Sequence, residues 1–229
     1  MISNKCLILQ PYFNLEVMEF NEKQLQIMDS ALAVFAEKGY SSASVRDIAQ
    51  KADVNVAMIS YYFGSKEKLL EALFRNHTAN MKGKIESILQ AKSADPFEKV
   101  DLLIDTYIDV IVNNRNFHRL MVREQALSKD GPLYQYIRDM KLRNKKLIEA
   151  AIKSGQKMGI FQKHIDATML SITLVGSVNM TFLNYKFLCQ EYKIKENDED
   201  GFYATILQRL RNHLKTMFKS FLTYGISNS

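Results

Sequence analysis

Apolar residues recur along most of the chain at spacings of three and four, the pattern that one face of an amphipathic helix produces. In the first regular segment, residues 21–38, this face carries Ile27, Ala31, Val34 and Phe35. Gly39 follows in the position where a left-handed residue commonly ends a helix. The same pattern predicts further helices over residues 44–52, 56–63, 65 onward, 96–111, 117–127, 131–158, 165–192 and about 203–221. We therefore expect an all-α protein of about nine helices.

Short polar residues stand where several of these helices should begin. Ser44 and Asp47 have the spacing of a capping box, with aspartate in place of the usual glutamate. Asn55 and Ser65 are in position to cap the third and fourth helices. Three short helices between residues 21 and 63, with a turn of about three residues before the third, predict a helix-turn-helix. The last helix of such a motif lies in the DNA major groove.

Apolar residues inside this motif predict which side of the third helix faces inward. Ala49 is small where the second and third helices would cross. Ile59 then faces inward from the third helix, and Phe63 completes the apolar contact. The aromatic run that ends this helix therefore divides, with Tyr61 and Tyr62 left for the DNA side.

Residues 167–185 carry no charged side chain, and a segment of this length could span a bilayer. Serine, threonine and asparagine residues interrupt the segment, and it stands alone in the chain. A helix that is apolar on most sides is typical of one buried in a core or in a subunit interface. We therefore expect a buried or interfacial helix here, not a membrane span.

The composition is that of a soluble globular protein, with 47% apolar and 24% charged residues. Cys6 and Cys189 lie far apart without a CxxC pair, so we expect two reduced thiols in a cytoplasmic protein. Residues 1–17 lack the features of a signal peptide and are expected to be an unstructured extension, or to lie upstream of the true start codon. The histidines are scattered and no catalytic motif occurs, so we predict no metal, no cofactor and no enzymatic activity.

The net charge of +6 permits an anionic partner such as nucleic acid. The predicted helix-turn-helix does not supply this charge, because residues 18–70 contain six basic and seven acidic side chains. The excess comes partly from a basic run over residues 141–157, which favours a solvated helix face over a second DNA site. DNA affinity must therefore rest on a few placed contacts and on helix N-termini that face phosphates.

The segment FAEKGYSSASVRDIAQKADVNVAMISYYFGSKEKLLEAL resembles the DNA-binding domain of TetR/AcrR-type transcriptional regulators over about residues 22–72. The resemblance rests on the F-x-x-x-G-Y end of the first helix, on V-R-D-I-A in the second and on the Y-Y-F-x-S-K-E junction. Two positions depart from the family pattern, since Asp53 replaces the usual turn glycine and Ser60 replaces a frequent tyrosine. The resemblance implies a helix-turn-helix DNA-binding domain over residues 18–66 and a helical effector-binding and dimerisation domain over residues 67–229.

The helix-turn-helix geometry and the resemblance together predict the DNA contacts. Arg46 can form a bidentate contact to a guanine edge, or instead a surface ion pair with Asp47 or Glu67. Ser44 can act as a helix cap, as a phosphate donor, or as both. Lys66 is expected to hold a phosphate, although it could be an ordinary surface lysine. The full predicted set is Ser44, Arg46, Asn55, Val56, Ala57, Met58, Ser60, Tyr61, Tyr62 and Lys66.

The resemblance also implies an effector pocket among the middle helices and a homodimer interface. Aromatic and methionine side chains there suit an apolar or amphipathic ligand, although each one singly could be ordinary core. The pocket candidates are Tyr107, Phe117, Met121, Met140, Phe161 and Met180. The uncharged helix and the last helix have broad apolar faces, which a dimer would bury as a four-helix arrangement. The interface candidates are Leu174, Gly176, Val178, Leu210, Leu214 and Phe218.

These observations predict a dimeric, sequence-specific DNA-binding transcriptional regulator. We expect a repressor that binds a palindromic operator on double-stranded DNA and is released by a small-molecule effector. The alternative is a helical ligand-binding or interaction protein that keeps the helix-turn-helix scaffold without specific DNA binding. The slightly acidic balance of residues 18–70 is the feature that favours this alternative.

Overall fold

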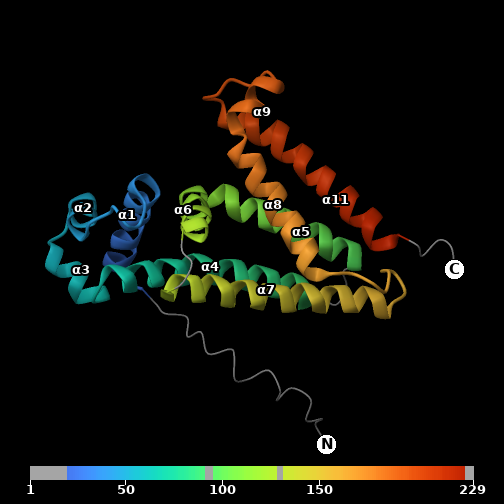
Figure 1. The fold of residues 1–229 in the computed structure, drawn as a ribbon, viewed down its shortest axis with the longest axis horizontal. Coiled ribbons are helices and arrows are strands. Elements are labelled where there is room, and N and C mark those ends of the chain that lie inside the picture. Colours follow the sequence, from blue (N-terminus) through green and yellow to red (C-terminus); the bar gives the residue numbers. More distant parts are fainter. Residues whose placement is uncertain (1–19, 91–94, 128–130, 225–229) are drawn as a thin grey trace, which may run out of the picture. The chain divides into compact units, whose positions relative to one another are not determined.

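The computed structural model describes residues 20–90, 95–127 and 131–224. The predicted extension over residues 1–17 and Cys6 lie outside the described residues. Every regular element in the described ranges is a helix, which confirms the predicted all-α class (Figure 1). The chain divides into two units, of which the first ends at Ala79 and the second begins at Asn80.

The first unit is built from three short helices and the first part of a long one. The short helices are α1 (Glu22–Lys38), α2 (Val45–Lys51) and α3 (Val56–Phe63), and the long one is α4 (Lys66–Gln90). Their bounds agree closely with the predicted helices. The predicted inward face of α1 is confirmed by the burial of Ile27, Ala31, Val34 and Phe35. Ile48 of α2 and Ile59 of α3 complete this core, which therefore holds the three helices together.

Side-chain caps start the helices at the predicted positions. Ser44 and Asp47 form a full capping box at α2, in which each side chain bonds the other residue's backbone N–H. Asn55 caps α3 by accepting a hydrogen bond at 2.9 Å from a backbone N–H of its first turn. Ser65 does the same for α4 at 3.2 Å. Each cap satisfies a backbone donor that has no partner inside its own helix.

The turn between α2 and α3 contains a left-handed residue that is not glycine. Asp53 has φ 50°, and aspartate adopts this conformation more readily than most residues. The backbone N–H of Val54 donates to the carbonyl of Ala49 at 3.0 Å, which closes the turn. Asp53 therefore takes the backbone conformation for which the family pattern has a glycine.

Helix α4 belongs to both units. Its residues Leu69, Leu70, Leu73 and Phe74 are buried, and they lie in the first unit. The first unit therefore ends later than the predicted domain boundary after Lys66, because the early turns of α4 contribute to its core.

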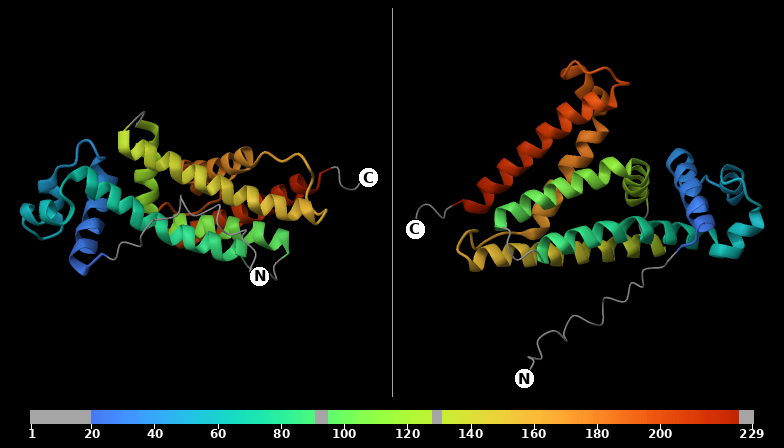
Figure 2. Two further views of the ribbon diagram at one scale, coloured as in Figure 1. Left: turned by 90° about the horizontal axis from the view of Figure 1, so that it is seen from below. Right: turned by 180° about the vertical axis from the view of Figure 1, so that it is seen from behind.

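The second unit contains the remaining helices. They are α5 (Pro96–Asn113), α6 (Arg115–Leu127), α7 (Gly131–Lys157), α8 (Ala167–Leu183), α9 (Tyr185–Glu191), α10 (Glu199–Phe202), the π-helical turn η2 (Tyr203–Leu207) and α11 (Gln208–Thr223). Both α5 and α8 pack against α7 and α11 (Figure 2). The core between them includes Ile104, Ile108, Val178, Phe202 and Leu214, all of which are buried.

The single helix predicted over residues 165–192 was wrong, because the structure has two helices there. The chain bends by 74° between α8 and α9, at Asn184. The Asn184 side-chain amide donates to the carbonyl of Met180 at 2.8 Å. Asparagine side chains that bond nearby backbone groups compete with the regular helical pattern. Over the described ranges no single helix is long and apolar enough to cross a membrane, and α8 and α9 meet that test only as this bent pair.

The last helical stretch begins earlier than predicted. Glu199 and Asp200, which precede the predicted start at about residue 203, form the start of α10, and the chain continues through η2 into α11. Asp198 caps this stretch by accepting a hydrogen bond from the N–H of Gly201 at 2.8 Å. A Cβ at Gly201 would lie 2.3 Å from the Asp198 carboxylate, so this close cap requires glycine.

Candidate nucleic-acid interface

Helix α3 has one buried face and one exposed face. Ile59 and Phe63 are 1% and 7% exposed and form the inner face. Tyr61 is 83% exposed on the opposite side, and Ala57 and Ser60 are exposed with it. Phe63 is therefore buried and Tyr61 exposed, as predicted, whereas the DNA contact of Tyr61 stays a prediction. An exposed face of small and aromatic side chains can approach base edges closely in a major groove.

The other predicted residues of α3 differ in accessibility. Asn55 is exposed but uses its side chain as the cap, and Val56 next to it is also exposed. Met58 and Tyr62 are only half-exposed. The Tyr62 ring contacts the Tyr61 ring edge to face, with the ring centroids 5.1 Å apart. This contact restricts how far the two tyrosines can move independently.

Arg46 is exposed near the N-terminus of α2 and makes no ion pair with any described residue. The predicted alternative partners are engaged elsewhere. Asp47 pairs with Lys38, whose Nζ lies 2.8 Å from its Oδ1, and Glu67 accepts a hydrogen bond from the Tyr40 hydroxyl at 3.0 Å. The guanidinium of Arg46 therefore remains accessible to a ligand outside this unit.

Asp47 is held in its charged form at the start of α2. The hydrogen bond from Lys38, and then those from Ser44, hold the pKa of its carboxyl well below the usual range. Lys38 thereby compensates the negative charge of Asp47 at the start of α2. This local ion pair reduces the electrostatic cost of the acidic balance in the predicted DNA-binding region.

Two predicted phosphate contacts have donors that are already engaged within the chain. The N–H and hydroxyl of Ser44 both donate to Asp47 Oδ2, at 2.9 and 2.7 Å. The ammonium of Lys66 donates to the backbone carbonyls of Tyr40 and Ala43, at 3.0 and 2.9 Å. Ser44 therefore acts as a cap in this structure, and Lys66 keeps one of its three N–H donors for any further partner.

Tyr40 is a residue of this region to which the sequence analysis gave no role. Its ring lies 4.4 Å from Lys66 Nζ, and its hydroxyl donates to Glu67. The ring also meets Phe35 edge to face at 5.4 Å. The tyrosine of the F-x-x-x-G-Y pattern was the sequence signal, but its partners Lys66 and Glu67 lie more than twenty residues away, so local spacing does not predict these contacts.

The predicted effector-pocket residues differ in how far their side chains are buried. Phe117 and Phe161 are buried, whereas Tyr107, Met121 and Met140 are half-buried. Met180 on α8 is 56% exposed, so its side chain does not point into an internal pocket. This corrects the prediction for Met180, because the side of α8 that packs inward carries Val178 instead.

Phe161 is part of the packed interior. Its ring contacts Phe97 edge to face at a centroid distance of 5.1 Å. It also packs directly on Gly155, where an added Cβ would lie 2.2 Å from the ring. The reading of Phe161 as ordinary core therefore describes its contacts better than a position in an open pocket.

A polar pair in the second unit was missed by the sequence analysis. His118 of α6 lies 2.7 Å from Asn179 of α8, measured from Nε2 to Oδ1. Phe182 lies beside the imidazole, with the ring centroids 5.8 Å apart. Burial lowers the pKa of His118, which favours the neutral ring at neutral pH. The only sequence signal for this pair was a polar asparagine within a largely apolar helix.

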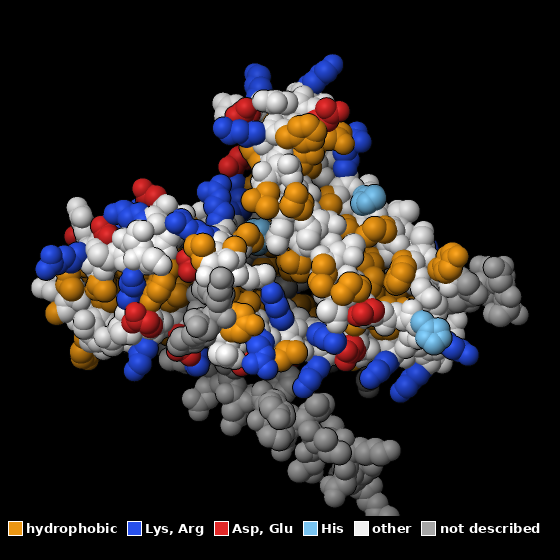
Figure 3. Space-filling model, viewed as in Figure 1, with side chains coloured by type: hydrophobic (Ala, Val, Ile, Leu, Met, Phe, Trp, Pro, Cys, Tyr) orange, Lys and Arg blue, Asp and Glu red, His pale blue; other side chains and the backbone are white. Residues whose placement is uncertain are grey.

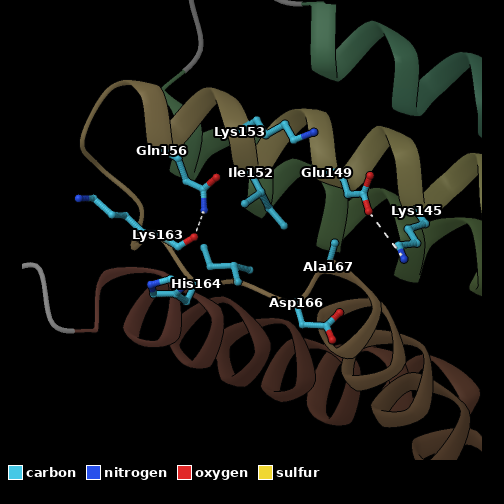
Figure 4. Close-up of a pocket in the computed structure, with 10 residues that line it drawn as sticks. Lys145, Glu149, Ile152, Lys153, Gln156, Lys163, His164, Asp166 and Ala167 are labelled. Carbon is cyan, nitrogen blue, oxygen red and sulfur yellow. Dashed lines mark hydrogen bonds and ion pairs between the residues drawn. The ribbon is translucent and has the colours of Figure 1, made fainter.

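The second unit also has an open groove of about 640 Å³ between α7 and the segment that leads into α8 (Figure 4). Ile152 and Ala167 lie on its inner walls, while the side chains of Lys153 and Lys163 extend away from it. Lys145 and Glu149 form an ion pair along one wall. None of the predicted effector residues lines this groove, and its mixed charges differ from the apolar lining expected for them.

The predicted dimer interface needs a similar correction. Val178, Leu214 and Phe218 are buried within the chain itself, so their side chains are not accessible to a partner subunit. Leu174 and Leu210 pack against the same core, and Gly176 is half-exposed. The side chains of Leu214 and Phe218 on α11 therefore face the core of this chain.

Polar contacts also fix the orientation of α11. Arg211 donates to the carboxylate of Asp105 on α5 at 3.0 Å, and Lys215 donates to the same carboxylate at 2.6 Å. Arg211 further pairs with Asp109. These contacts hold the apolar stripe of α11 against α5.

Exposed apolar side chains gather instead on the outer face of α8 and on α9 (Figure 3). They recur at helical spacing and lie opposite buried Ala167 and Val178. The members of this outer α8 face are Met169, Ile172, Met180 and Leu183, with Phe187 of α9 next in line. Helix α8 is thus apolar on both sides, although the described residues cover only one of them.

Comparisons with known proteins support the division into two parts. Residues 27–73 match the family described as bacterial regulatory proteins of the tetR family. Residues 93–186 match the tetracyclin repressor-like C-terminal domain. Together the two matches cover more than half of the chain.

Curated relatives match over most of their length. A probable HTH-type transcriptional regulator, YttP, of Bacillus subtilis is 27% identical over 85% of this chain and 93% of its own. The HTH-type transcriptional repressor KstR2 of Mycobacterium tuberculosis is 23% identical over 66% of this chain and 76% of its own.

Solved structures share the fold. The transcriptional regulator FadR from Bacillus subtilis, in complex with stearoyl-CoA, superimposes with a TM-score of 0.66 at 22% identity, covering 86% of this chain and 98% of that one. The ketosteroid transcriptional regulator KstR2 of Mycobacterium tuberculosis gives a TM-score of 0.59 at 21% identity, covering 71% and 83%.

Proposed function

The chain belongs to the TetR family of bacterial regulatory proteins, and from this premise we propose that it is a homodimeric repressor of transcription in the cytoplasm. It binds a palindromic operator and leaves it when a small-molecule effector binds. The observation that carries the DNA-binding part is the exposed face of α3 beside an accessible Arg46. Ile59 and Phe63 hold that face outward, so its small and aromatic side chains are available to base edges.

Arg46→Ala tests the proposed base contact. A bidentate arginine contact to guanine contributes about 1–3 kcal/mol of discrimination against other bases. We therefore expect the variant to bind a selected operator more weakly by this amount, and to lose its preference at one base pair of each half-site. Fluorescence anisotropy with the operator and with single-base variants of it measures both effects.

Lys51→Ala is the matched control, because Lys51 is also an exposed cation on α2 but is not among the predicted contacts. This variant should keep the base preference. If Arg46→Ala instead weakens binding equally on every DNA sequence, Arg46 contacts a phosphate and does not read a base.

A second copy of this chain is the proposed partner of the outer α8 face. A helix that is apolar all round is normally buried all round, and the exposed side here carries Met169, Ile172, Met180 and Leu183. A two-fold dimer would cover this side on both subunits at once. The same symmetry would place two copies of α3 on the two halves of a palindrome.

An apolar or amphipathic effector suits the second unit. The FadR structure contains stearoyl-CoA, and KstR2 is described as a ketosteroid regulator, so the names of both neighbours include a molecule with a large apolar part. Here Phe117 and the half-buried Met121 offer apolar contacts, and the His118–Asn179 pair offers a polar one. Ligand would favour a conformation that no longer fits the two half-sites, and its differential affinity for the two conformations limits the extent of release.

The alternative function, a ligand-binding protein without specific DNA binding, is favoured by one observation. Ser44 and Lys66, two of the predicted phosphate contacts, have most of their donors engaged within the chain. Comparing the affinity of the protein for different DNA sequences distinguishes the two functions. A folded dimer that binds an apolar ligand but shows the same affinity for all DNA sequences would favour the alternative.

A further inference from the structure

The junction between α1 and α4 is held by a single ammonium group. Lys66 Nζ donates to the carbonyl of Tyr40 at 3.0 Å and to that of Ala43 at 2.9 Å. It also lies 4.4 Å from the centroid of the Tyr40 ring, within cation–π distance. Three interactions of one group therefore connect the first turn of α4 to the segment that precedes α2.

A second contact reinforces the same junction. The Tyr40 hydroxyl donates to Glu67 at 3.0 Å, and the Tyr40 ring rests against Phe35 of α1. Ala43, at the end of the segment, is buried, and its N–H donates to the carbonyl of Gly39 at 3.1 Å. The segment from Tyr40 to Ala43 is thus fixed at both ends.

Exchanging the carbonyl partners of Lys66 for a DNA phosphate would be energetically unfavourable. Hydrogen bonds from an ammonium group to carbonyl oxygens are stronger than those between neutral groups. Turning Lys66 towards a DNA phosphate would leave the part-buried carbonyls of Tyr40 and Ala43 without their donor, and unpaired polar groups in such positions are costly. The ammonium is therefore expected to stay in place when DNA binds.

We propose that Lys66 is a positioning residue for DNA reading: it fixes the segment from Tyr40 to Ala43, and through it the N-terminus of α2 that carries Arg46. Ala43 is followed directly by Ser44, the cap of α2, so the position of this carbonyl determines where the helix begins. The role differs from that of a phosphate contact, because Lys66 acts on DNA through Arg46. This inference rests on the proposed function.

Salt dependence separates the two roles. The logarithm of the DNA affinity falls with the logarithm of salt concentration, with a slope of about 0.9 for each phosphate that a protein cation neutralises. Fluorescence anisotropy is measured at several salt concentrations for wild type, Lys66→Met, Lys66→Arg and Lys68→Met, with a selected operator and a scrambled duplex. Lys68 is the control because it is an exposed lysine in the same turn.

We expect Lys66→Met and Lys66→Arg both to weaken operator binding by about tenfold or more, the order of one lost base contact in each half-site. Binding to the scrambled duplex and the salt slope should stay at the wild-type values. Arginine should fail to rescue, because its planar fork does not reproduce the geometry of an ammonium between two carbonyls.

The opposite pattern overturns the proposal. A phosphate role predicts that Lys66→Met lowers the salt slope by about 2 for a dimer and weakens both duplexes equally, and that Lys66→Arg restores binding. Unchanged operator binding by Lys66→Met would also overturn it.

A measurement on wild type remains available if the variants do not fold. The ¹⁵N-detected NMR signal of the Lys66 ammonium should be protected from exchange in the free protein and should not shift on addition of operator. A signal that shifts towards that of a phosphate-bound lysine contradicts the proposal. If wild type binds no DNA specifically, the proposed function fails, and protection of this ammonium in the free protein still reports on the junction alone.

Discussion

Replacing Met180 and Leu183 together by aspartate is expected to convert the protein to a monomer and to weaken its binding to a two-half-site operator at least about a hundredfold. Both side chains are largely exposed, at 56% and 68%, on the outer face of α8. Two carboxylates per subunit would have to be buried against the same two of the partner, which a two-fold interface cannot compensate. Each monomer would then bind one half-site without the gain that linkage to the second provides.

Light scattering at micromolar concentration and operator titration measure the two effects. Leu102→Asp is the control, because Leu102 is an exposed leucine of the same unit on α5. It should leave both the mass and the operator affinity at wild-type values. A Met180→Asp, Leu183→Asp variant that keeps the dimer mass would show that the outer α8 face is not the interface.

Ile59→Ala and Tyr61→Ala should differ in their effect on stability, although the two residues are only two positions apart on α3. Ile59 is fully buried against the core of the first unit, and truncation of a buried isoleucine to alanine costs about 2–5 kcal/mol of unfolding free energy. This is a large part of the stability of a typical domain, about 5–15 kcal/mol. Tyr61 is exposed, so its truncation should leave the unfolding free energy within about 0.5 kcal/mol of wild type.

The two variants should also lose operator binding for different reasons. Tyr61→Ala should weaken binding of the folded protein, whereas Ile59→Ala should lower it mainly by reducing the folded fraction. Urea unfolding followed by circular dichroism, together with anisotropy at low temperature, separates the two causes. Equal destabilisation by both variants would contradict the division of α3 into a core face and a DNA face.

Local sequence signals predicted the helices, the caps and the turn of the first unit. The caps at Ser44 and Asn55 and the left-handed turn at Asp53 depend on residues within a few positions of one another. The inward face of α3 follows from helical period, which is why the burial of Ile59 and the exposure of Tyr61 were predicted. The contacts of Lys66 were not predictable in this way, because its carbonyl partners lie 26 and 23 residues away.

Helical periodicity could not predict which helix faces of the second unit are buried. Helix α8 is apolar on both sides, so the pattern gave no means to distinguish the inner Val178 from the outer Met180. The stripe of α11 was recognised, but whether it faces the core or a partner depends on its contacts with α5. The break occurs at Asn184, whose side chain bonds the carbonyl of Met180, and helical periodicity carries no signal for it.

Selection of binding sites from random DNA by the purified full-length dimer tests the central claim most directly. The enriched sequences should form an inverted repeat whose half-site centres lie on the order of 34–36 Å apart, or a multiple of that distance, as two copies of α3 would require. Arg46→Ala should enrich a repeat that has lost one defined base pair in each half. The absence of any enriched sequence at low salt, from protein shown to be folded and dimeric, would contradict the assignment of this chain as a sequence-specific regulator.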